Sequence, residues 1–143
     1  MVVDGDDNVI VTGFSTSGSS FNWDYATVKY SSAGEQLWAA RYERPGSFSD
    51  VAQAVAVDSA NNVIVTGNST GSATAEDYAT VKYARATGAQ LWEARYNGPG
   101  NSVDRAFDVA VDSADNVLVT GESTGSGTSA DYATVKYAGS AGA

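Results

Sequence analysis

The feature that most constrains the fold is an internal repeat of 54 residues. The tripeptide Val-Thr-Gly begins at positions 11, 65 and 119, and the dipeptide Leu-Trp recurs at the same interval, at positions 37 and 91. A fixed period of tens of residues indicates a repeat architecture, in which each unit buries its apolar faces against its neighbours. The period therefore determines the fold class more strongly than any local propensity.

Each repeat unit contains four runs of residues that are typical of β-strands. In the second unit these runs cover residues 54–57, 62–66, 78–83 and 90–96. Residues 58–62, Asp-Ser-Ala-Asn-Asn, join the first two runs, and Asn and Asp tolerate the left-handed backbone conformation of a tight turn. Gly34 and Gly88 mark a second hairpin between the third and fourth runs. The pattern predicts four antiparallel strands per unit.

Four antiparallel strands in each repeat are typical of a β-propeller blade. A β-solenoid usually has shorter rungs without three successive hairpins, and a β-sandwich does not require near-identical sequence every 54 residues. We therefore predict an all-β propeller fold with about three four-stranded blades, forming a single domain over residues 1–143. The predicted blades cover about 1–49, about 50–103 and about 104–143, and the last lacks its outer strand.

A propeller of about three blades leaves two blade faces without a neighbour. Blades pack face to face, so Val, Tyr and Trp side chains of a terminal blade would lie in water, over a larger patch than soluble monomers usually expose. Propellers commonly have about 4 to 8 blades, and twofold symmetry is the commonest symmetry of oligomers. We expect two copies to form a homodimeric, six-bladed ring. The alternative is a longer parent protein that supplies the missing blades.

The segment 54–67, Ala-Val-Ala-Val-Asp-Ser-Ala-Asn-Asn-Val-Ile-Val-Thr-Gly, resembles the bacterial β-propeller repeats called SBBP. Its hairpin is similar to that of NHL repeats, and residues 86–92 resemble the tryptophan-bearing turn of quinoprotein propellers. The resemblance spans essentially the whole chain and implies that the Ala-Val-Ala-Val strand is innermost and the Leu-Trp strand outermost. It also implies a scaffold or adhesion module at a bacterial cell surface, although such motifs specify fold better than activity.

Composition excludes much of conventional catalysis. The chain has no Cys and no His, which excludes disulfides, Cys/His zinc sites, Cys nucleophiles, Ser-His-Asp triads and haem bound through His. Paired carboxylates are the catalytic chemistry that stays open, and no pair stands out, so a carboxylate-dependent hydrolase is the weakest alternative. We expect no enzymatic activity and no cofactor.

A metal site is suggested by one segment only, and the match is incomplete. Residues 4–8, Asp-Gly-Asp-Asp-Asn, match the start of a calcium-binding EF-hand loop, but Val9 and Ser15 occupy the positions that require Gly and a bidentate Glu. We therefore predict no EF-hand and assign no metal ligands. A simpler calcium site in this turn stays open.

The charge of the chain argues against polyanionic partners. Eight Lys and Arg stand against 17 Asp and Glu, a formal net charge of −9, so a nucleic acid would meet net repulsion. No apolar run approaches the ~18 residues of a membrane-spanning helix. We expect neither nucleic-acid binding nor membrane insertion, and the partners left are a second copy of the chain and a protein or glycan ligand.

The residues that break the repeat are the candidate ligand contacts. Loop 14–23 is one residue longer than its copies and contains or adjoins three aromatic residues, and the loop before the first strand of each blade shares its propeller face. Aromatic rings beside carboxylates are suited to binding sugars or peptides. The candidates are Phe14, Phe21, Trp23, Asp50 and Asp104. Alternatively, the aromatics fill the loop against the blade, and the aspartates accept hydrogen bonds from backbone N–H groups between blades.

Residues that obey the repeat have a structural interpretation. All eight tyrosines occupy repeated positions and are predicted to lie in the blade core. Lys29, Lys82 and Lys136 also share one repeated position, for which we predict a structural role such as covering an aromatic neighbour. Trp38 and Trp92 are predicted to be core residues.

Overall fold

The computed structural model describes residues 1–16, 22–44, 49–71 and 75–142, and regular secondary structure in these ranges consists of β-strands. The strands in chain order are β1 (Val2–Val3), β2 (Val9–Thr16), β3 (Trp23–Tyr30), β4 (Gln36–Tyr42), β5 (Asp50–Val57), β6 (Val63–Thr70), β7 (Glu76–Tyr83), β8 (Gln90–Tyr96), β9 (Asp104–Val111), β10 (Val117–Thr124) and β11 (Ala130–Tyr137). The all-β prediction is confirmed.

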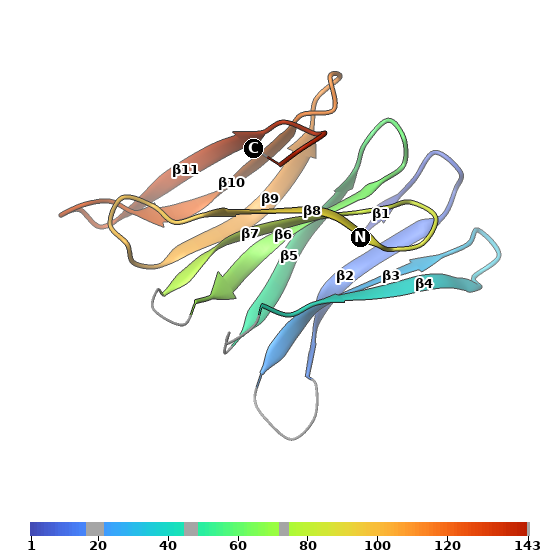
Figure 1. Cartoon of the computed structure of the whole chain (residues 1–143), viewed down its shortest axis with the longest axis horizontal. Helices are drawn as coiled ribbons and strands as arrows, with labels where there is room; N and C mark the ends of the chain where they lie inside the picture. Colours follow the sequence, from blue (N-terminus) through green and yellow to red (C-terminus); the bar gives the residue numbers. More distant parts are fainter. Residues whose placement is uncertain (17–21, 45–48, 72–74, 143) are drawn as a thin grey trace.

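The strands form three antiparallel sheets that follow one another along the chain (Figure 1). The first two sheets have the strand orders β1-β2-β3-β4 and β5-β6-β7-β8, and the third contains β9-β10-β11. The Ala-Val-Ala-Val strand therefore lies at one edge of its sheet and the Leu-Trp strand at the other. The arrangement is consistent with successive β-propeller blades.

Tight turns fix the register of each hairpin. Between β5 and β6, the backbone N–H of Asp58 donates to the carbonyl of Asn62 at 3.1 Å, and Asn61 has a φ of 61°. Asp7 and Asp115, at the same point of the other two hairpins, also have positive φ. A residue with left-handed backbone conformation at this point lets the chain reverse, as expected from the Asn and Asp residues in the sequence. Gly88 has a φ of 68° in the turn between β7 and β8.

Two hydrophobic cores hold the three sheets together. Between the first and second sheets, Ile10, Tyr25 and Trp38 pack against Val65 and Val81. The corresponding residues form the core between the second and third sheets: Ile64, Tyr78, Trp92, Val119 and Val135. Contacts between the sheets are concentrated at β5 and β9, the Ala-Val-Ala-Val strand and its copy. This places the two first strands of these units together, as the resemblance implied.

Polar side chains also cross from each sheet to the next. The Tyr25 hydroxyl donates to the Ala79 carbonyl at 3.0 Å, and the Trp38 indole N–H donates to the Arg85 carbonyl at 3.0 Å. The second sheet repeats both contacts toward the third sheet: Tyr78 to Ala133 at 3.2 Å and Trp92 to Gly139 at 3.1 Å. These bonds fix the position of one sheet on the next because each acceptor is a backbone carbonyl.

The outer face of the third sheet is exposed. Tyr25 and Tyr78 are fully buried, whereas Tyr132, at the same repeated position of β11, is 90% exposed. Val3 and Val11 on the first sheet are also exposed. Tyr132, predicted to lie in the blade core, is thus exposed in the single chain, because no sheet within the described residues packs over it. These exposed residues on the first and third sheets are consistent with three blades that do not close a ring by themselves. A closed ring is not seen in the single chain.

Candidate functional site

The exposed aromatic pair Phe14 and Trp23 lies where β2 ends and β3 begins. Phe14 is 52% exposed and Trp23 41% exposed, and their ring centroids are 4.9 Å apart with a 35° tilt. Both are strand residues: Phe14 lies opposite Tyr25, and Trp23 lies opposite Thr16. The two rings therefore present neighbouring apolar surfaces at the ends of paired strands. The third aromatic candidate, Phe21, lies outside the described residues.

The other two repeats have no aromatic residue at the positions of this pair. Asn68 and Glu76 occupy the two positions in the second sheet, and the Asn68 amide donates to the Glu76 carboxylate at 3.0 Å. Glu122 and Ala130 occupy them in the third. The aromatic pair is thus specific to the first sheet. The other two sheets form the same strand pairing without it.

Asp50 and Asp104 lie at the starts of β5 and β9 and are fully buried. The Asp104 carboxylate accepts hydrogen bonds from the backbone N–H groups of Gly98 at 2.7 Å and Thr124 at 3.2 Å. Asp50 accepts one from the backbone N–H of Arg44 at 3.1 Å. Each carboxylate therefore binds the backbone of a residue that lies between the preceding outer strand and its own strand. This geometry supports their structural interpretation over contact with a ligand.

The predicted proximity of the loops on this face is visible at Trp23. Trp23 forms a parallel β-bridge with Ser49, the residue immediately before Asp50. The end of the β2–β3 connection and the start of β5 are therefore neighbours. The structure brings Phe14, Trp23 and the Asp50 region together, with the aromatic rings at the surface and the carboxylate beneath it.

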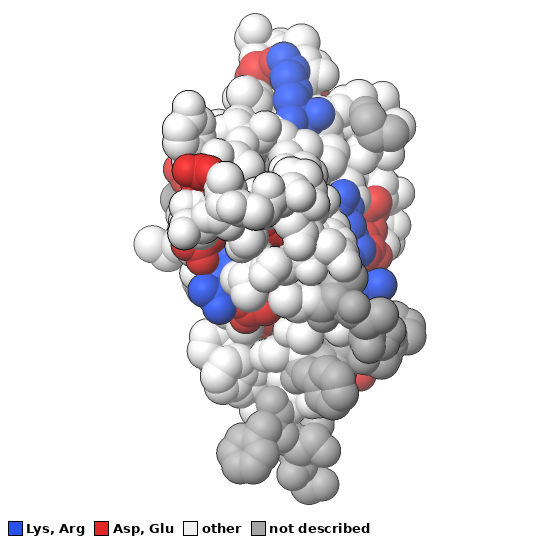
Figure 2. Space-filling view, turned by 90° about the vertical axis from the view of Figure 1, so that its left-hand side faces the viewer, with Lys and Arg blue, Asp and Glu red and all other residues white. Residues whose placement is uncertain are grey.

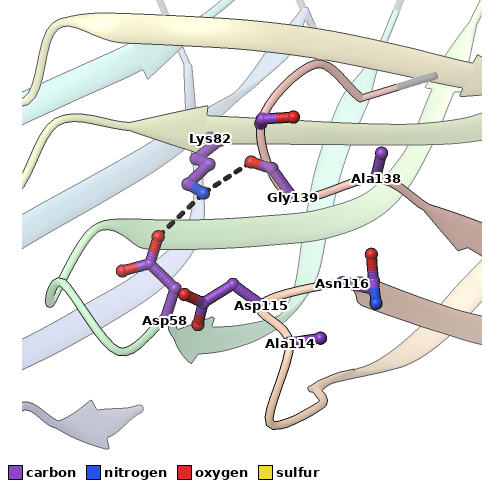
Figure 3. A pocket seen from close by; sticks show the side chains of 8 residues that line it. Asp58, Lys82, Ala114, Asp115, Asn116, Ala138 and Gly139 are labelled. Carbon is purple, nitrogen blue, oxygen red and sulfur yellow. Dashed lines mark hydrogen bonds and ion pairs between the residues drawn. The ribbon is translucent and has the colours of Figure 1, made fainter.

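An Asp–Lys pair stabilises the opposite end of each sheet. In the second sheet, the Asp58 carboxylate accepts hydrogen bonds from the backbone N–H groups of Ala60 and Asn62, and its distance to the Lys82 ammonium is 2.7 Å. Lys82 also donates to the carbonyl of Gly139 in the third sheet at 2.7 Å (Figure 3). One buried cation therefore connects its own hairpin turn to the next sheet.

The first and third sheets repeat this pair in different environments. Asp4 and Lys29, 2.6 Å apart, are buried, whereas Asp112 and Lys136, 2.8 Å apart, are partly exposed. Burial alone would raise the pKa of Asp4, but hydrogen bonds from Lys29 and Asn8 outweigh it and lower the pKa to about 2. The pKa of Asp58 is lowered by the same balance of burial, Lys82 and Asn62. These carboxylates are therefore ionised at neutral pH.

The predicted structural role of the lysines is confirmed for Lys29 and Lys82, and its physical basis is the neutralisation of a buried aspartate. The turn that resembled a calcium loop contains the aspartate of such an Asp–Lys pair. The Asp4 carboxylate binds Lys29, Asn8 and the backbone N–H of Asp6. No group of three or more metal-ligating side chains occurs within residues 1–16, 22–44, 49–71 and 75–142.

A hollow of about 330 Å³ lies above the Asp58–Lys82 pair, between the second and third sheets (Figure 3). Its walls include Asp115, Asn116 and Gly139. Asp115 is engaged in holding the sheets together, since its carboxylate accepts hydrogen bonds from the N–H and hydroxyl of Ser59 at 2.9 and 2.6 Å. Asp58, Lys82 and Asp115, which line the hollow, thus all take part in contacts within the fold.

Surface charge is dispersed on the side of the molecule that lies at the left in Figure 1. Figure 2 shows small separate groups of acidic and basic side chains on this face, divided by uncharged residues. The described part of the chain contains no helix long and apolar enough to cross a membrane.

Sequence reasoning missed the pairing of Asp58 with Lys82. A usable signal was present: the Asp that opens each first hairpin turn and the Lys of each third strand recur together in all three repeats. Two opposite charges that repeat together are candidates for a contact within the unit.

Comparisons with known proteins give a partial identification. No protein-family model matches the chain, so the SBBP resemblance stays a prediction. The chain is 29% identical over 157 residues to an uncharacterised WD repeat-containing protein of Acanthamoeba polyphaga mimivirus; the match covers 85% of this chain and 11% of that protein's length. A protein of unknown function from Bacteroides caccae has 12% identity and a TM-score of 0.44, over 79% of this chain and 40% of its own. The first similarity and the all-β architecture fit a β-propeller-like repeat protein.

Proposed function

We propose that this protein is a non-catalytic, propeller-like interaction scaffold that binds a protein partner through Phe14 and Trp23. The observation that carries the proposal is the exposed aromatic pair, because two large rings in contact at a strand end bury apolar area when a partner covers them. The second and third repeats pair the same two strands without aromatic residues at these positions, so the strand pairing does not require the pair.

The environments of three buried carboxylates support a non-catalytic role. A carboxylate-dependent hydrolase needs two accessible carboxyl groups that can share a substrate. Asp50 and Asp104 are buried and bound to backbone N–H groups, and Asp58 is neutralised by Lys82. The similarity to a protein named as WD repeat-containing supports a scaffold as well, although this chain spans only 11% of that protein. Location at a cell surface stays a prediction of the SBBP resemblance.

Exchanging the aromatic pair for the residues of the second repeat tests this proposal. The variant Phe14→Asn with Trp23→Glu carries the pair found at Asn68 and Glu76, which the same hairpin already accommodates. Peptides selected from a random library against the wild-type chain should lose at least tenfold in affinity for this variant, measured by fluorescence anisotropy. We expect the circular dichroism and the thermal midpoint of the variant to stay close to those of the wild type.

Two results would contradict the proposal. Selected peptides that bind the variant and the wild type equally would show that Phe14 and Trp23 are not the contact surface. A glycan array on which the wild type binds a defined sugar, and the variant does not, would replace the protein ligand with a carbohydrate, since aromatic rings also stack on sugars.

We further propose that two copies close a six-bladed ring. Tyr25 and Tyr78 each donate from one sheet to the backbone of the next. Tyr132 has the same sequence context and is exposed, and the corresponding acceptor on the first sheet of a second copy is the carbonyl of Ala26. Exposed Val3 and Val11 would lie in the same new interface, where the second sheet places Val57 and Val65.

Solution mass measures the closure directly. Light scattering coupled to size exclusion should give twice the 14.7 kDa of one chain, and Tyr132→Asp should reduce the mass to that of one chain, because it places a charge in an apolar interface. The exposed turn variant Ser32→Ala is the control and should leave the dimer intact. A folded wild-type monomer at micromolar concentration would contradict the ring.

A further inference from the structure

An arginine on the outer strand stabilises the second sheet by binding four acceptors at once. Arg95 on β8 donates to the Ser69 hydroxyl at 2.8 Å, to the Ser69 carbonyl at 2.9 Å and to the Asp77 carboxylate at 3.1 Å. It also lies 3.4 Å from the Tyr42 hydroxyl of the first sheet. The planar guanidinium supplies five N–H donors in a fixed fork, which suits this set of acceptors.

The first sheet repeats the arrangement. Arg41 on β4 donates to the Ser15 hydroxyl at 2.8 Å and to the Ser15 carbonyl at 3.2 Å, and it pairs with the Asp24 carboxylate. Arg41 lies opposite Ala26 in the sheet, and Arg95 lies opposite Ala79. The position of the arginine on the outer strand is therefore the same relative to the third strand of each sheet.

The third sheet presents the same acceptors without an arginine among the described residues. Ser123, Asp131 and Tyr96 are the counterparts of Ser69, Asp77 and Tyr42, and all three line one hollow of about 200 Å³. Ser123 is only 5% exposed, and its hydroxyl oxygen is buried with no hydrogen-bond partner. A buried hydroxyl without a partner is costly, so the hollow favours a donor.

The backbone beside this hollow is also open. β11 is the last strand of its sheet, and within the described residues no strand pairs with its outer edge (Figure 1). An unpaired edge offers N–H and C=O groups to an extended segment. The edge and the hollow meet at Ala133, which lines the hollow and is the counterpart of Ala26 and Ala79.

We propose that the outer edge of β11 binds an extended, arginine-bearing peptide segment of a partner, in antiparallel orientation, with the arginine opposite Ala133. The guanidinium would bind the Ser123 hydroxyl and the Asp131 carboxylate, and the next residue would lie opposite Tyr132. The first two sheets have Tyr42 and Tyr96 at that point, with ring centroids 5.2 and 5.3 Å from their tyrosine neighbours. An aromatic residue after the arginine therefore adds a ring contact with Tyr132.

This strand site lies apart from the surface formed by Phe14 and Trp23. It belongs to the third sheet and its border with the second, whereas the aromatic pair belongs to the first. The two sites can therefore be tested independently.

A peptide with the sequence of residues 89–97, labelled and blocked at both ends, is the probe. It carries the outer-strand pattern of β8, including Arg95, and its Glu and Arg cancel in charge. Fluorescence anisotropy should show saturable binding to the intact chain. The Arg95→Lys peptide should bind at least tenfold more weakly, because lysine keeps the charge but cannot bridge the serine and the aspartate. Hydrogen exchange at β11 amides should slow when the unchanged peptide is bound.

Variants of the chain locate the site. Asp131→Asn removes the carboxylate from an exposed position and should weaken binding at least tenfold without changing the circular dichroism. Asp7→Asn changes the charge equally at an exposed turn residue and should bind like the wild type. The proposal is overturned by a lack of binding at about 1 mM peptide, by equal affinity of the arginine and lysine peptides, or by full affinity of Asp131→Asn. Binding without protection of β11 would also overturn it.

Discussion

Replacing Lys82 with Met should lower the free energy of unfolding by about 3 kcal/mol. The substitution keeps an unbranched side chain of nearly the same length but leaves the Asp58 carboxylate buried without its cation. Breaking a buried ion pair from one side typically costs about 3–5 kcal/mol. The lower end of that range is expected because the N–H groups of Ala60 and Asn62 still bind Asp58. Urea unfolding followed by tryptophan fluorescence measures the change.

The same substitution in the third repeat is the matched control. The Lys82 side chain is 7% exposed and that of Lys136 is 55% exposed, although both lie in identical heptapeptides and pair with an aspartate at a similar distance. An exposed pair contributes less than about 1 kcal/mol, so Lys136→Met should have a small effect. Equal losses for the two variants would show that burial does not set the strength of these pairs.

The pH dependence separates the lost charge from lost packing. The pKa of Asp58 is lowered in the folded protein, so the stability from its pairing is present above the unfolded-state pKa of about 3.9 and is lost as the pH falls through the lower folded-state value. The difference between wild type and Lys82→Met should therefore be constant from pH 7 to about pH 5 and should narrow below pH 4. A difference that is independent of pH would indicate a packing effect.

The strands and turns could be predicted because their signals are local and repeated three times. Alternating Val residues define the strands, and Asn61 and Gly88 define two turns that need positive φ. The short inner strand Val2–Val3 and the missing outer strand of the third sheet also follow from counting positions in the repeat. In such a chain, each local pattern is confirmed by its copies.

Burial of individual side chains could not be predicted from the repeat. Tyr78 and Tyr132 lie in the same sequence, Asp-Tyr-Ala-Thr-Val-Lys-Tyr, yet one is fully buried and the other 90% exposed. The difference comes from the neighbouring sheet, which the local sequence does not contain. The guanidinium site at Ser123 was missed for the same reason, since it becomes visible only when three equivalent environments are compared in space.

The candidate site was predicted only in part, and departures from the repeat were the useful signal. Phe14 and Trp23 were singled out because they break the repeat at a loop that is longer than its copies, and the structure places their rings close together at the surface. Asp50 and Asp104 were singled out by position alone, and the structure uses both to bind backbone N–H groups. A residue that recurs in every repeat usually has a structural role within the repeat, whereas a residue found in one repeat only is a better candidate for binding.

Replacing Gly67 with Ala should lower the free energy of unfolding by about 3 kcal/mol or more. A Cβ atom at this position would lie 2.0 Å from the carbonyl oxygen of Val51 and 2.9 Å from the Cα of Ala52. Backbone atoms of the neighbouring strand cannot move away as the end of a flexible side chain can. β5 and β6 would therefore have to separate near the register shift between Ala52 and Ala54. The clash is one of space, since the φ of Gly67 is not in the left-handed region.

Gly13 provides the control, because it occupies the same position of the first repeat and has open space around its Cα. β1 pairs with β2 only at Val9 and Ile10, so no strand lies opposite Gly13 on that side. Gly13→Ala should change stability by less than about 1 kcal/mol, and a small gain is expected because alanine loses less backbone entropy than glycine on folding. Gly121→Ala should be as harmful as Gly67→Ala, since its Cβ would lie 1.9 Å from the Arg105 carbonyl oxygen. Thermal and urea unfolding of the three variants would test this order, and a tolerated Gly67→Ala would mean that the inner strands are not held as closely as these distances require.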